Sequence, residues 1–215
     1  DSQYIAHTYA RFNVTFVRGQ GALLFDDTGK QYIDMGSGIA VSVLGYGNEA
    51  WEQAVCEQAH QLSHVSNLYF TQPQTELASL LCKRSGMKRA FFGNSGAEAN
   101  ECAIKTARKY SADKHGDNVR PVIVTLNNSF HGRTLATLAA TGQDAFHHTF
   151  GPFPEGFAYV DANDVDGLKA VLASQPVCAV MLETVQGEGG VEPLKREYLQ
   201  AVRDLTAQQD VLMIV

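Results

Sequence analysis

The sequence predicts an α/β fold with a mainly parallel sheet that is covered by helices on both faces. Short runs of nearly continuous apolar residues, typical of strands buried on both sides, alternate with longer runs at helical spacing. The 215 residues are 45% hydrophobic, which is enough to bury a sizeable core. No internal repeat or low-complexity tract interrupts this alternation. The length therefore indicates one large domain, or one and a half small ones.

The elements of the sheet follow one another from residue 89 onward. The predicted strands are RAFFG (89–93), VIVTL (122–126), FAYV (157–160), VCAVMLE (177–183) and VLMIV (211–215). The helices predicted between them are 97–114, 163–173 and 195–209, with a weaker candidate at 133–140. Two earlier helices are predicted at 49–62 and 75–85, and the first of them places Trp51 and Val55 on one apolar face.

The beginning of the chain is predicted to be a small β-ribbon. ALLFDDTGKQYIDM (22–35) sets two alternating apolar runs around Asp-Asp-Thr-Gly, in which the glycine supplies a positive φ for the turn. GSGIAVSVLGYGN (36–48) is rich in glycine and apolar residues, and we expect it to be a loop or short strand packed against other parts of the fold. We therefore divide the chain into an N-terminal segment, 1–48, and a larger domain, 49–215.

Charge and composition exclude several classes of partner. The net charge is −6, and none of the 17 basic residues form a run, which argues against a nucleic-acid or anionic-membrane partner. No stretch approaches about 18 uninterrupted apolar residues, and no basic-then-apolar leader opens the chain. We expect a cytoplasmic protein that neither spans a membrane nor is secreted.

The four cysteines lie far apart in the sequence and lack metal-ligand spacing. They are Cys56, Cys82, Cys102 and Cys178, with no CxxC pair among them. We interpret them as small buried residues in a reducing compartment, and predict no metal site.

The stretch FFGNSGAEANE (91–101) combines a predicted strand, a Gly-Asn-Ser-Gly turn and a helix start. The first N–H groups of a helix have no intrahelical acceptor, so such a turn can hold an anion without a lysine. Ser95 could add a hydroxyl there, and Gly96 allows close approach. Alternatively, Asn94 or Ser95 simply caps the helix. Neither GxGxxG nor GxxxxGK[ST] occurs in the chain, so the usual nucleotide fingerprints are missing.

Three ordered motifs resemble those of class III aminotransferases, enzymes of the pyridoxal-phosphate fold type I. FFGNSGAEANECAIKTARKY (91–110) is similar to the family's phosphate-binding segment, and SFHGRTLATLAATG (129–142) and ETVQGEGGV (183–191) resemble its next two signatures. With RGQGALLFDDTGKQYIDMGSGIAV upstream, the resemblance covers essentially the whole chain. It implies fold type I in truncated form, with 1–48 part of the small domain and 49–215 the incomplete first half of the cofactor-binding domain.

The resemblance implies pyridoxal 5′-phosphate as cofactor and assigns five residues to it. Ser95, Gly96 and Ala97 match the turn that holds the phosphate, and Phe130 matches the aromatic residue that stacks on the pyridine ring. Glu183 matches a glutamate near the ring. From the residues alone, Phe130 could equally be a core side chain, and Glu183 a solvated loop charge.

Three further residues match positions that bind substrate. Arg133 corresponds to the arginine that takes the substrate α-carboxylate with its bidentate guanidinium, and Tyr9 to a tyrosine that helps hold the same group. Glu188 matches a glutamate on the substrate side that pairs with an arginine from later in the chain. Arg133 could also be an ordinary surface arginine. We interpret His131, near the start of the second motif, as structural rather than as an acid or base.

The segment GIAVSVLG (38–45) narrows the choice of amino donor. It resembles acetylornithine and succinylornithine aminotransferases, whereas ornithine enzymes carry a tyrosine about where Ile39 stands. Because that tyrosine binds a free amino group, an isoleucine favours N-acetylornithine, with 2-oxoglutarate as the acceptor, in arginine metabolism. The alternatives are succinylornithine, ornithine or 4-aminobutyrate as donor, or a non-catalytic cofactor-binding fragment. Thr184 departs from the proline usual in the third motif, which affects only the rigidity of the Glu188 loop.

The resemblance also implies that residues essential to the reaction lie outside this sequence. The Schiff-base lysine and the aspartate that pairs with the pyridinium nitrogen are expected beyond Val215, so no catalytic residue is assigned here. The chain opens on Asp1 without a methionine and stops within the predicted strand 211–215, as expected for part of a longer protein. We expect this part to be inactive alone, and the complete protein to be a homodimer acting on amino acids and 2-oxo acids.

Overall fold

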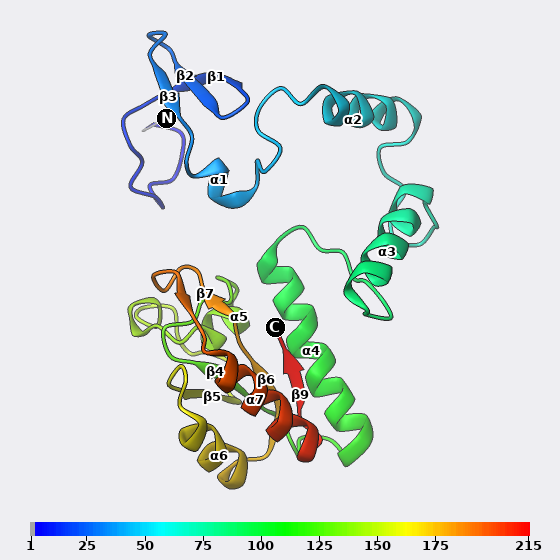
Figure 1. Cartoon of the computed structure of the whole chain (residues 1–215), viewed down its shortest axis with the longest axis vertical. Coiled ribbons are helices and arrows are strands. Elements are labelled where there is room, and N and C mark those ends of the chain that lie inside the picture. The colour runs from blue at the N-terminus through cyan, green and yellow to red at the C-terminus, as the bar shows by residue number, and fades with distance from the viewer. Residues whose placement is uncertain (1–2) are drawn as a thin grey trace. The chain divides into compact units, whose positions relative to one another are not determined.

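A computed structural model describes residues 3–215, in which the chain divides into two units (Figure 1). The first unit ends at Leu77 and the second comprises Ala78–Val215. The division predicted after residue 48 concerns the domains of the complete protein and stays a prediction.

The centre of the second unit is a four-stranded parallel sheet. Its strands are β4 (Val122–Leu126), β5 (Phe157–Val160), β6 (Val177–Met181) and β9 (Leu212–Ile214), in the order β5-β4-β6-β9. Pairing is parallel throughout, with Ile123 opposite Phe157 and Ala179 opposite Leu212. All five residues of β6 are buried, as their continuous apolar sequence predicts for a strand covered on both faces. The predicted parallel sheet is confirmed.

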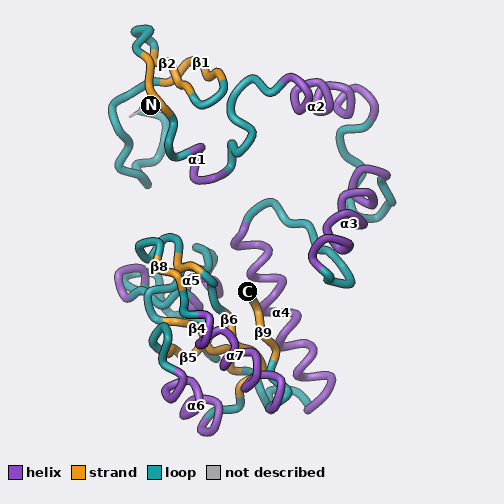
Figure 2. The backbone as a smooth tube through the Cα atoms, in the orientation of Figure 1, coloured by secondary structure: helices purple, strands orange, loops and turns teal. Residues whose placement is uncertain are grey.

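Helices cover both faces of this sheet. Because successive side chains of a strand point to opposite faces, Val124 packs into one core cluster and Ile123 into the other. The helices on the Val124 side are α6 (Val165–Ser174) and α7 (Arg196–Gln208), and those on the Ile123 side are α4 (Gly96–His115) and α5 (Leu135–Ala140). Each of the four helices was predicted, and Figure 2 shows the loops that connect them to the strands.

The prediction of a strand at 89–93 is wrong. These residues form no hydrogen-bonded ladder, and Phe91 is 62% exposed. A strand exists only where a neighbouring strand accepts and donates its backbone hydrogen bonds. Among residues 3–215 no strand lies beside this apolar run, so it is irregular up to the turn at Asn94.

The first unit contains the predicted β-ribbon with an additional strand. β1 (Phe16–Gln20), β2 (Leu23–Asp26) and β3 (Gln31–Ile33) form an antiparallel sheet in that order. The β2–β3 turn is built around Asp26, whose carboxylate accepts from the backbone N–H of Thr28 (3.0 Å) and Lys30 (2.9 Å) and from the Tyr32 hydroxyl (2.8 Å). Hydrogen bonds to the charged form, the largest from the Thr28 side chain, lower the pKa of Asp26 to about 2.

The segment 36–48 is mostly irregular, as predicted, but contains a short helical turn. α1 (Ser37–Ala40) includes positive φ angles at Gly38 and Ile39, so it is not a regular helix. Close packing of this segment is confirmed where Tyr46 exchanges backbone hydrogen bonds with Gly21. A Cβ on Gly45 would lie 2.7 Å from the Gly21 carbonyl oxygen, so only glycine fits there.

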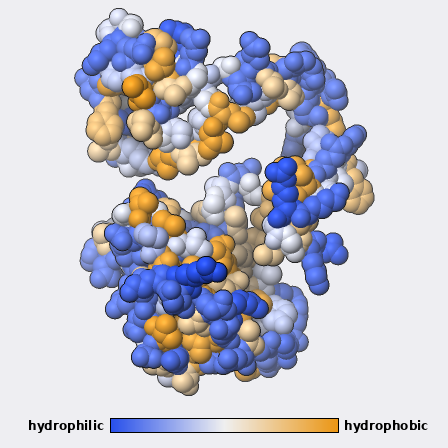
Figure 3. Space-filling view, in the orientation of Figure 1, coloured by the Kyte–Doolittle hydropathy of each residue, from blue (hydrophilic) through white to orange (hydrophobic). Residues whose placement is uncertain are grey.

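Two helices follow, α2 (Glu49–Gln61) and α3 (Gln72–Ser85), and neither contains a buried residue. Asn48 caps α2 by accepting a hydrogen bond from the N–H of Trp51 (3.0 Å). Both helices were predicted. However, the predicted apolar face of α2 is exposed, with Trp51 58% accessible, and apolar side chains show at the surface in Figure 3.

A buried histidine lies inside the second unit. His131 is 4% exposed, and its Nε2 has no hydrogen-bond partner among the described residues. Burial lowers its pKa to about 4, because the imidazolium loses its hydration. His131 is therefore neutral near pH 7, and its interpretation as a structural residue stays a prediction.

His131 makes the stability of the complete protein pH-dependent. Its folded pKa lies below the unfolded value near 6.5, so the unfolded state binds the proton first on acidification. Its contribution, about 3 kcal/mol in full, is present above pH 6.5 and is lost as the pH falls towards 4. Urea unfolding at pH 7 and pH 5 should show His131→Leu losing less stability than the wild type. The exposed His148→Leu is the matched control and should behave as wild type; an unchanged loss in His131→Leu would contradict the expectation.

Candidate functional site

The first feature of the site is the turn that begins α4. Ser95 has an extended backbone (φ −153°, ψ 162°), and its Oγ accepts a hydrogen bond from the N–H of Glu98 (3.2 Å). The Glu98 carboxylate in turn accepts from the N–H of Asn94. The capping role that the sequence left open is thus confirmed for Ser95, in an arrangement close to a capping box.

Capping leaves this turn able to bind an anion. Within residues 3–215 no group accepts a hydrogen bond from the N–H of Gly96 or Ala97. A Cβ built on Gly96 would meet no atom within 4 Å, so the space above the turn is open. The Ser95 hydroxyl, which accepts from Glu98, can still donate its proton. The turn therefore offers backbone and hydroxyl donors that fit a phosphate.

The second feature comprises the loops that follow β4 and β6. These strands are neighbours, so their carboxyl ends lie together at one edge of the sheet, where parallel α/β sheets form their binding sites. Glu183, two residues after β6, joins the two loops. Its Oε1 accepts from the N–H of Phe130 (2.9 Å) and its Oε2 from the N–H of Gly187 (3.2 Å).

A short hairpin after β6 adds further bonds between these loops. β7 (Val185–Gln186) pairs with β8 (Glu192–Pro193), a pair that the sequence did not predict. Gln186 donates to the Asn127 carbonyl (2.9 Å), and Asn128 donates to the Gly189 carbonyl (2.7 Å). A Cβ on Gly189 would lie 2.4 Å from the Asn128 carbonyl oxygen, so the hairpin can approach only because glycine stands there.

Phe130 and Arg133 lie in the loop after β4. The Phe130 ring is half-buried and makes an edge contact with Phe146, with ring centroids 6.1 Å apart. The Arg133 guanidinium carbon lies 5.3 Å from the Phe146 centroid and 6.0 Å from that of Phe130. Arg133 is exposed and forms no ion pair with any acid of the described chain. Its bidentate donors are thus open to an external carboxylate.

Glu188 and Tyr9 lie in different units of the chain. Glu188 is exposed in the hairpin, and its carboxylate accepts from the Gln143 amide, which also donates to the Ser129 carbonyl (3.1 Å). Tyr9 belongs to the first unit, is 66% exposed and lies with its ring centroid 5.8 Å from the Arg11 guanidinium carbon. The second unit therefore contains every predicted site residue except Tyr9, and the roles assigned to all of these residues stay predictions.

Residues that the sequence analysis did not single out complete the site. Phe146 and Gln143 follow the second motif and carried no local signal, because their contacts depend on the fold. Gly132 did carry one: a glycine between His131 and Arg133 indicates special backbone geometry, and its φ is +136°. Asn100, on α4, donates to the His131 carbonyl (2.7 Å).

Residues 3–215 contain no cluster of three or more His, Cys, Asp or Glu side chains able to hold a metal ion. No helix in the same range is long and apolar enough to cross a membrane.

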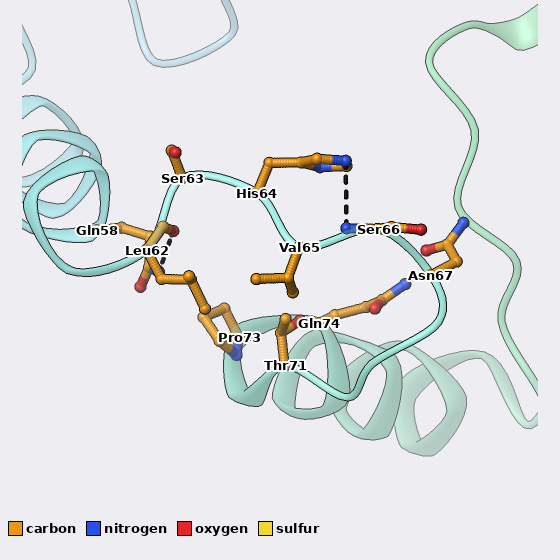
Figure 4. A pocket seen from close by; sticks show the side chains of 10 residues that line it. All are labelled: Gln58, Leu62, Ser63, His64, Val65, Ser66, Asn67, Thr71, Pro73 and Gln74. Carbon is orange, nitrogen blue, oxygen red and sulfur yellow. Dashed lines mark hydrogen bonds between the residues drawn. The ribbon is translucent and has the colours of Figure 1, made fainter.

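A pocket of about 330 Å³ lies between the end of α2 and the start of α3 (Figure 4). Its lining includes His64, whose Nε2 accepts from the N–H of Ser66 (3.2 Å), but no Lys, Arg, Asp or Glu, so it offers no charge for a phosphate or carboxylate.

Comparison with known proteins identifies relatives over the whole chain. The acetylornithine aminotransferases of Haemophilus ducreyi and Wolinella succinogenes are 53% and 49% identical to it. Each alignment covers all of this chain and 54% of the relative, so the chain spans about half the length of these curated relatives.

Solved structures agree with this relationship. The ornithine aminotransferase of Toxoplasma gondii matches with a TM-score of 0.93 at 30% identity, covering 99% of this chain and 51% of that one. The N-acetylornithine aminotransferase of Stenotrophomonas maltophilia matches with a TM-score of 0.80 at 40% identity, covering 95% and 50%. The expected fold type I is thereby confirmed, and pyridoxal phosphate is the cofactor of this family. Residues 4–215 match the family described as aminotransferase class-III, and the chain belongs to that family.

Proposed function

We propose that the complete protein transfers an amino group from N-acetylornithine to 2-oxoglutarate, as a step of arginine metabolism. The observation that carries this proposal is Arg133, an arginine without an acidic partner among residues 3–215 that lies beside the half-buried Phe130. Relatives at 53% and 49% identity are named acetylornithine aminotransferases, which supports the choice of donor.

Each predicted site residue of the second unit has a role in this proposal. Ser95, Gly96 and Ala97 would hold the cofactor phosphate with a hydroxyl and backbone N–H groups, and Phe130 would pack against the pyridine ring. Glu183 fixes Phe130 through its backbone N–H. Pyridoxal phosphate, when bound, supplies an electron sink that stabilises negative charge on the carbon bearing the amino group.

The remaining residues would bind the substrate. Arg133 would orient the α-carboxylate with two parallel N–H donors, helped by Tyr9, and Glu188 would contact the substrate from the hairpin. Ile39 stands where a tyrosine would favour a free amino group, which supports an N-acylated donor. None of the eight lysines in this chain lies in the context of the family's catalytic lysine, so we propose that this part alone is inactive.

Two properties of the complete protein belong to the same proposal. We propose a cytoplasmic homodimer, supported by the family resemblance and by the acidic composition. The second candidate function is transamination of free ornithine, which the structural match to the Toxoplasma gondii ornithine aminotransferase favours. Succinylornithine and 4-aminobutyrate are the remaining alternative donors.

Amino-donor profiling of the complete protein tests the function. With 2-oxoglutarate as acceptor, kcat/KM for N-acetylornithine should exceed that for ornithine and 4-aminobutyrate by more than about tenfold, the discrimination that about 1.4 kcal/mol supplies. Residues 1–215 expressed alone should show no turnover. Preference for ornithine or 4-aminobutyrate by the same factor would contradict the choice of donor, and turnover by the isolated part would contradict its inactivity.

Replacing Arg133 with lysine tests the carboxylate site. Loss of the bidentate fork should raise KM for the amino donor at least about tenfold, because a charge-assisted hydrogen bond contributes about 1.5–3 kcal/mol. The visible absorbance of bound cofactor should stay at the wild-type level. Arg196→Lys, at the exposed start of α7, is the matched control and should change neither value. Loss of the absorbance in Arg133→Lys would mean that Arg133 supports the cofactor or the fold instead.

A further inference from the structure

One face of α4 contacts the loop that carries Phe130 and Arg133. Ala97, Asn100 and Glu101 are spaced i, i+3 and i+4, so they lie together on that face. Asn100 Nδ2 donates to the His131 carbonyl (2.7 Å), and Glu101 accepts from the Thr134 hydroxyl. The same helix begins with the turn proposed to hold the phosphate. This face of α4 therefore links the phosphate turn to the loop that carries the Phe130 ring and the Arg133 guanidinium.

Backbone contact fixes how closely the loop approaches α4. Gly132 has φ +136°, and a Cβ on it would lie 2.9 Å from the Ala97 Cβ and 2.5 Å from Thr137 Oγ1. No side chain fits in that space, so the loop packs directly on the first turn of the helix. Packing sets the separation, but it does not by itself stop the loop from sliding along the helix.

The Asn100 bond supplies a directional contact from α4 to the backbone of the loop. The His131 carbonyl lies between Phe130 and Arg133 in the chain, and the His131 N–H donates to Thr141 Oγ1 (3.0 Å) on the other side. The His131 ring is buried, so the residue is anchored at ring, N–H and carbonyl. Of the two backbone hydrogen bonds, the one from Asn100 comes from the helix that carries the phosphate turn.

We infer that Asn100 is a positioning residue, which sets the place of Phe130 and Arg133 relative to the bound phosphate by holding the His131 carbonyl. The inference rests on the proposed function and adds a residue to it. Asn100 itself touches neither cofactor nor substrate. Its effect reaches the site through the loop, so its removal should disturb the ring orientation and the carboxylate geometry more than phosphate binding.

Asn100→Asp in the complete protein tests the inference. The substitution keeps the size of the side chain but replaces the donor with an acceptor that faces the His131 carbonyl. The visible-range circular dichroism per bound pyridoxal phosphate, which reports how rigidly the ring is held, should fall at least twofold. KM for the amino donor should rise about tenfold, the effect of losing one well-oriented hydrogen bond. Competition of inorganic phosphate with cofactor uptake should stay within twofold of the wild type.

Ser111→Ala is the matched control on the same helix. Ser111 Oγ donates to the Arg120 carbonyl (2.9 Å), so this variant also loses one bond from α4 to a loop, but at the far end of the helix. It should lower the melting temperature while leaving the dichroism and KM unchanged. If Asn100→Asp does not fold, Asn100→Ala replaces it as the test variant, because it lacks the added charge. The dichroism per bound cofactor and KM should change in the same way.

Two results would overturn the inference, and they are distinguishable. If both Asn100 variants keep the wild-type dichroism per bound cofactor and the wild-type KM, and lose only melting temperature as Ser111→Ala does, Asn100 is merely structural. If the complete wild-type protein takes up no pyridoxal phosphate, the proposed function fails, and the inference with it, before any variant is compared.

Discussion

The Glu183 carboxylate accepts hydrogen bonds from the backbone of two loops, the N–H of Phe130 after β4 and the N–H of Gly187 after β6. Both loops leave the same edge of the sheet, because β4 and β6 are neighbouring parallel strands. The N–H of Phe130 is partly buried and needs an acceptor, and a charged acceptor makes a stronger bond than a neutral one. One side chain thus satisfies both loops and holds them together, and the bonds of Gln186 and Asn128 extend that contact.

This arrangement separates residues that present groups to a ligand from residues that hold them in place. The α4 turn presents N–H groups, Phe130 a ring and Arg133 a guanidinium. Glu183 and Asn100 are each bonded to the backbone of the Phe130–Arg133 loop, from β6 and from α4 respectively. A loop fixed from two elements loses little further freedom when a ligand binds, so more of the interaction energy is available for affinity and orientation.

Sequence patterns predicted the sheet well where burial decides the structure. The runs 122–126 and 157–160 coincide with β4 and β5, because strands covered on both faces are nearly all apolar. The run 89–93 is also largely apolar, but it has no partner strand among residues 3–215, and an apolar run does not reveal pairing. The site residues were found through motifs, whereas Asn100 and Gln143 were not, since their partners His131 and Glu188 lie 31 and 45 residues away. Only the fold brings such pairs together.

Amide hydrogen exchange in the complete protein, comparing wild type with Glu183→Gln, tests most directly whether Glu183 joins the two loops. The glutamine keeps one acceptor oxygen but points an N–H₂ group at the second backbone donor. The account predicts that the amide of Phe130, of Gly187 or of both exchanges at least about tenfold faster, with β4 and β6 unchanged, because local opening becomes easier by about 1.4 kcal/mol or more. Wild-type protection at both amides in Glu183→Gln would contradict it.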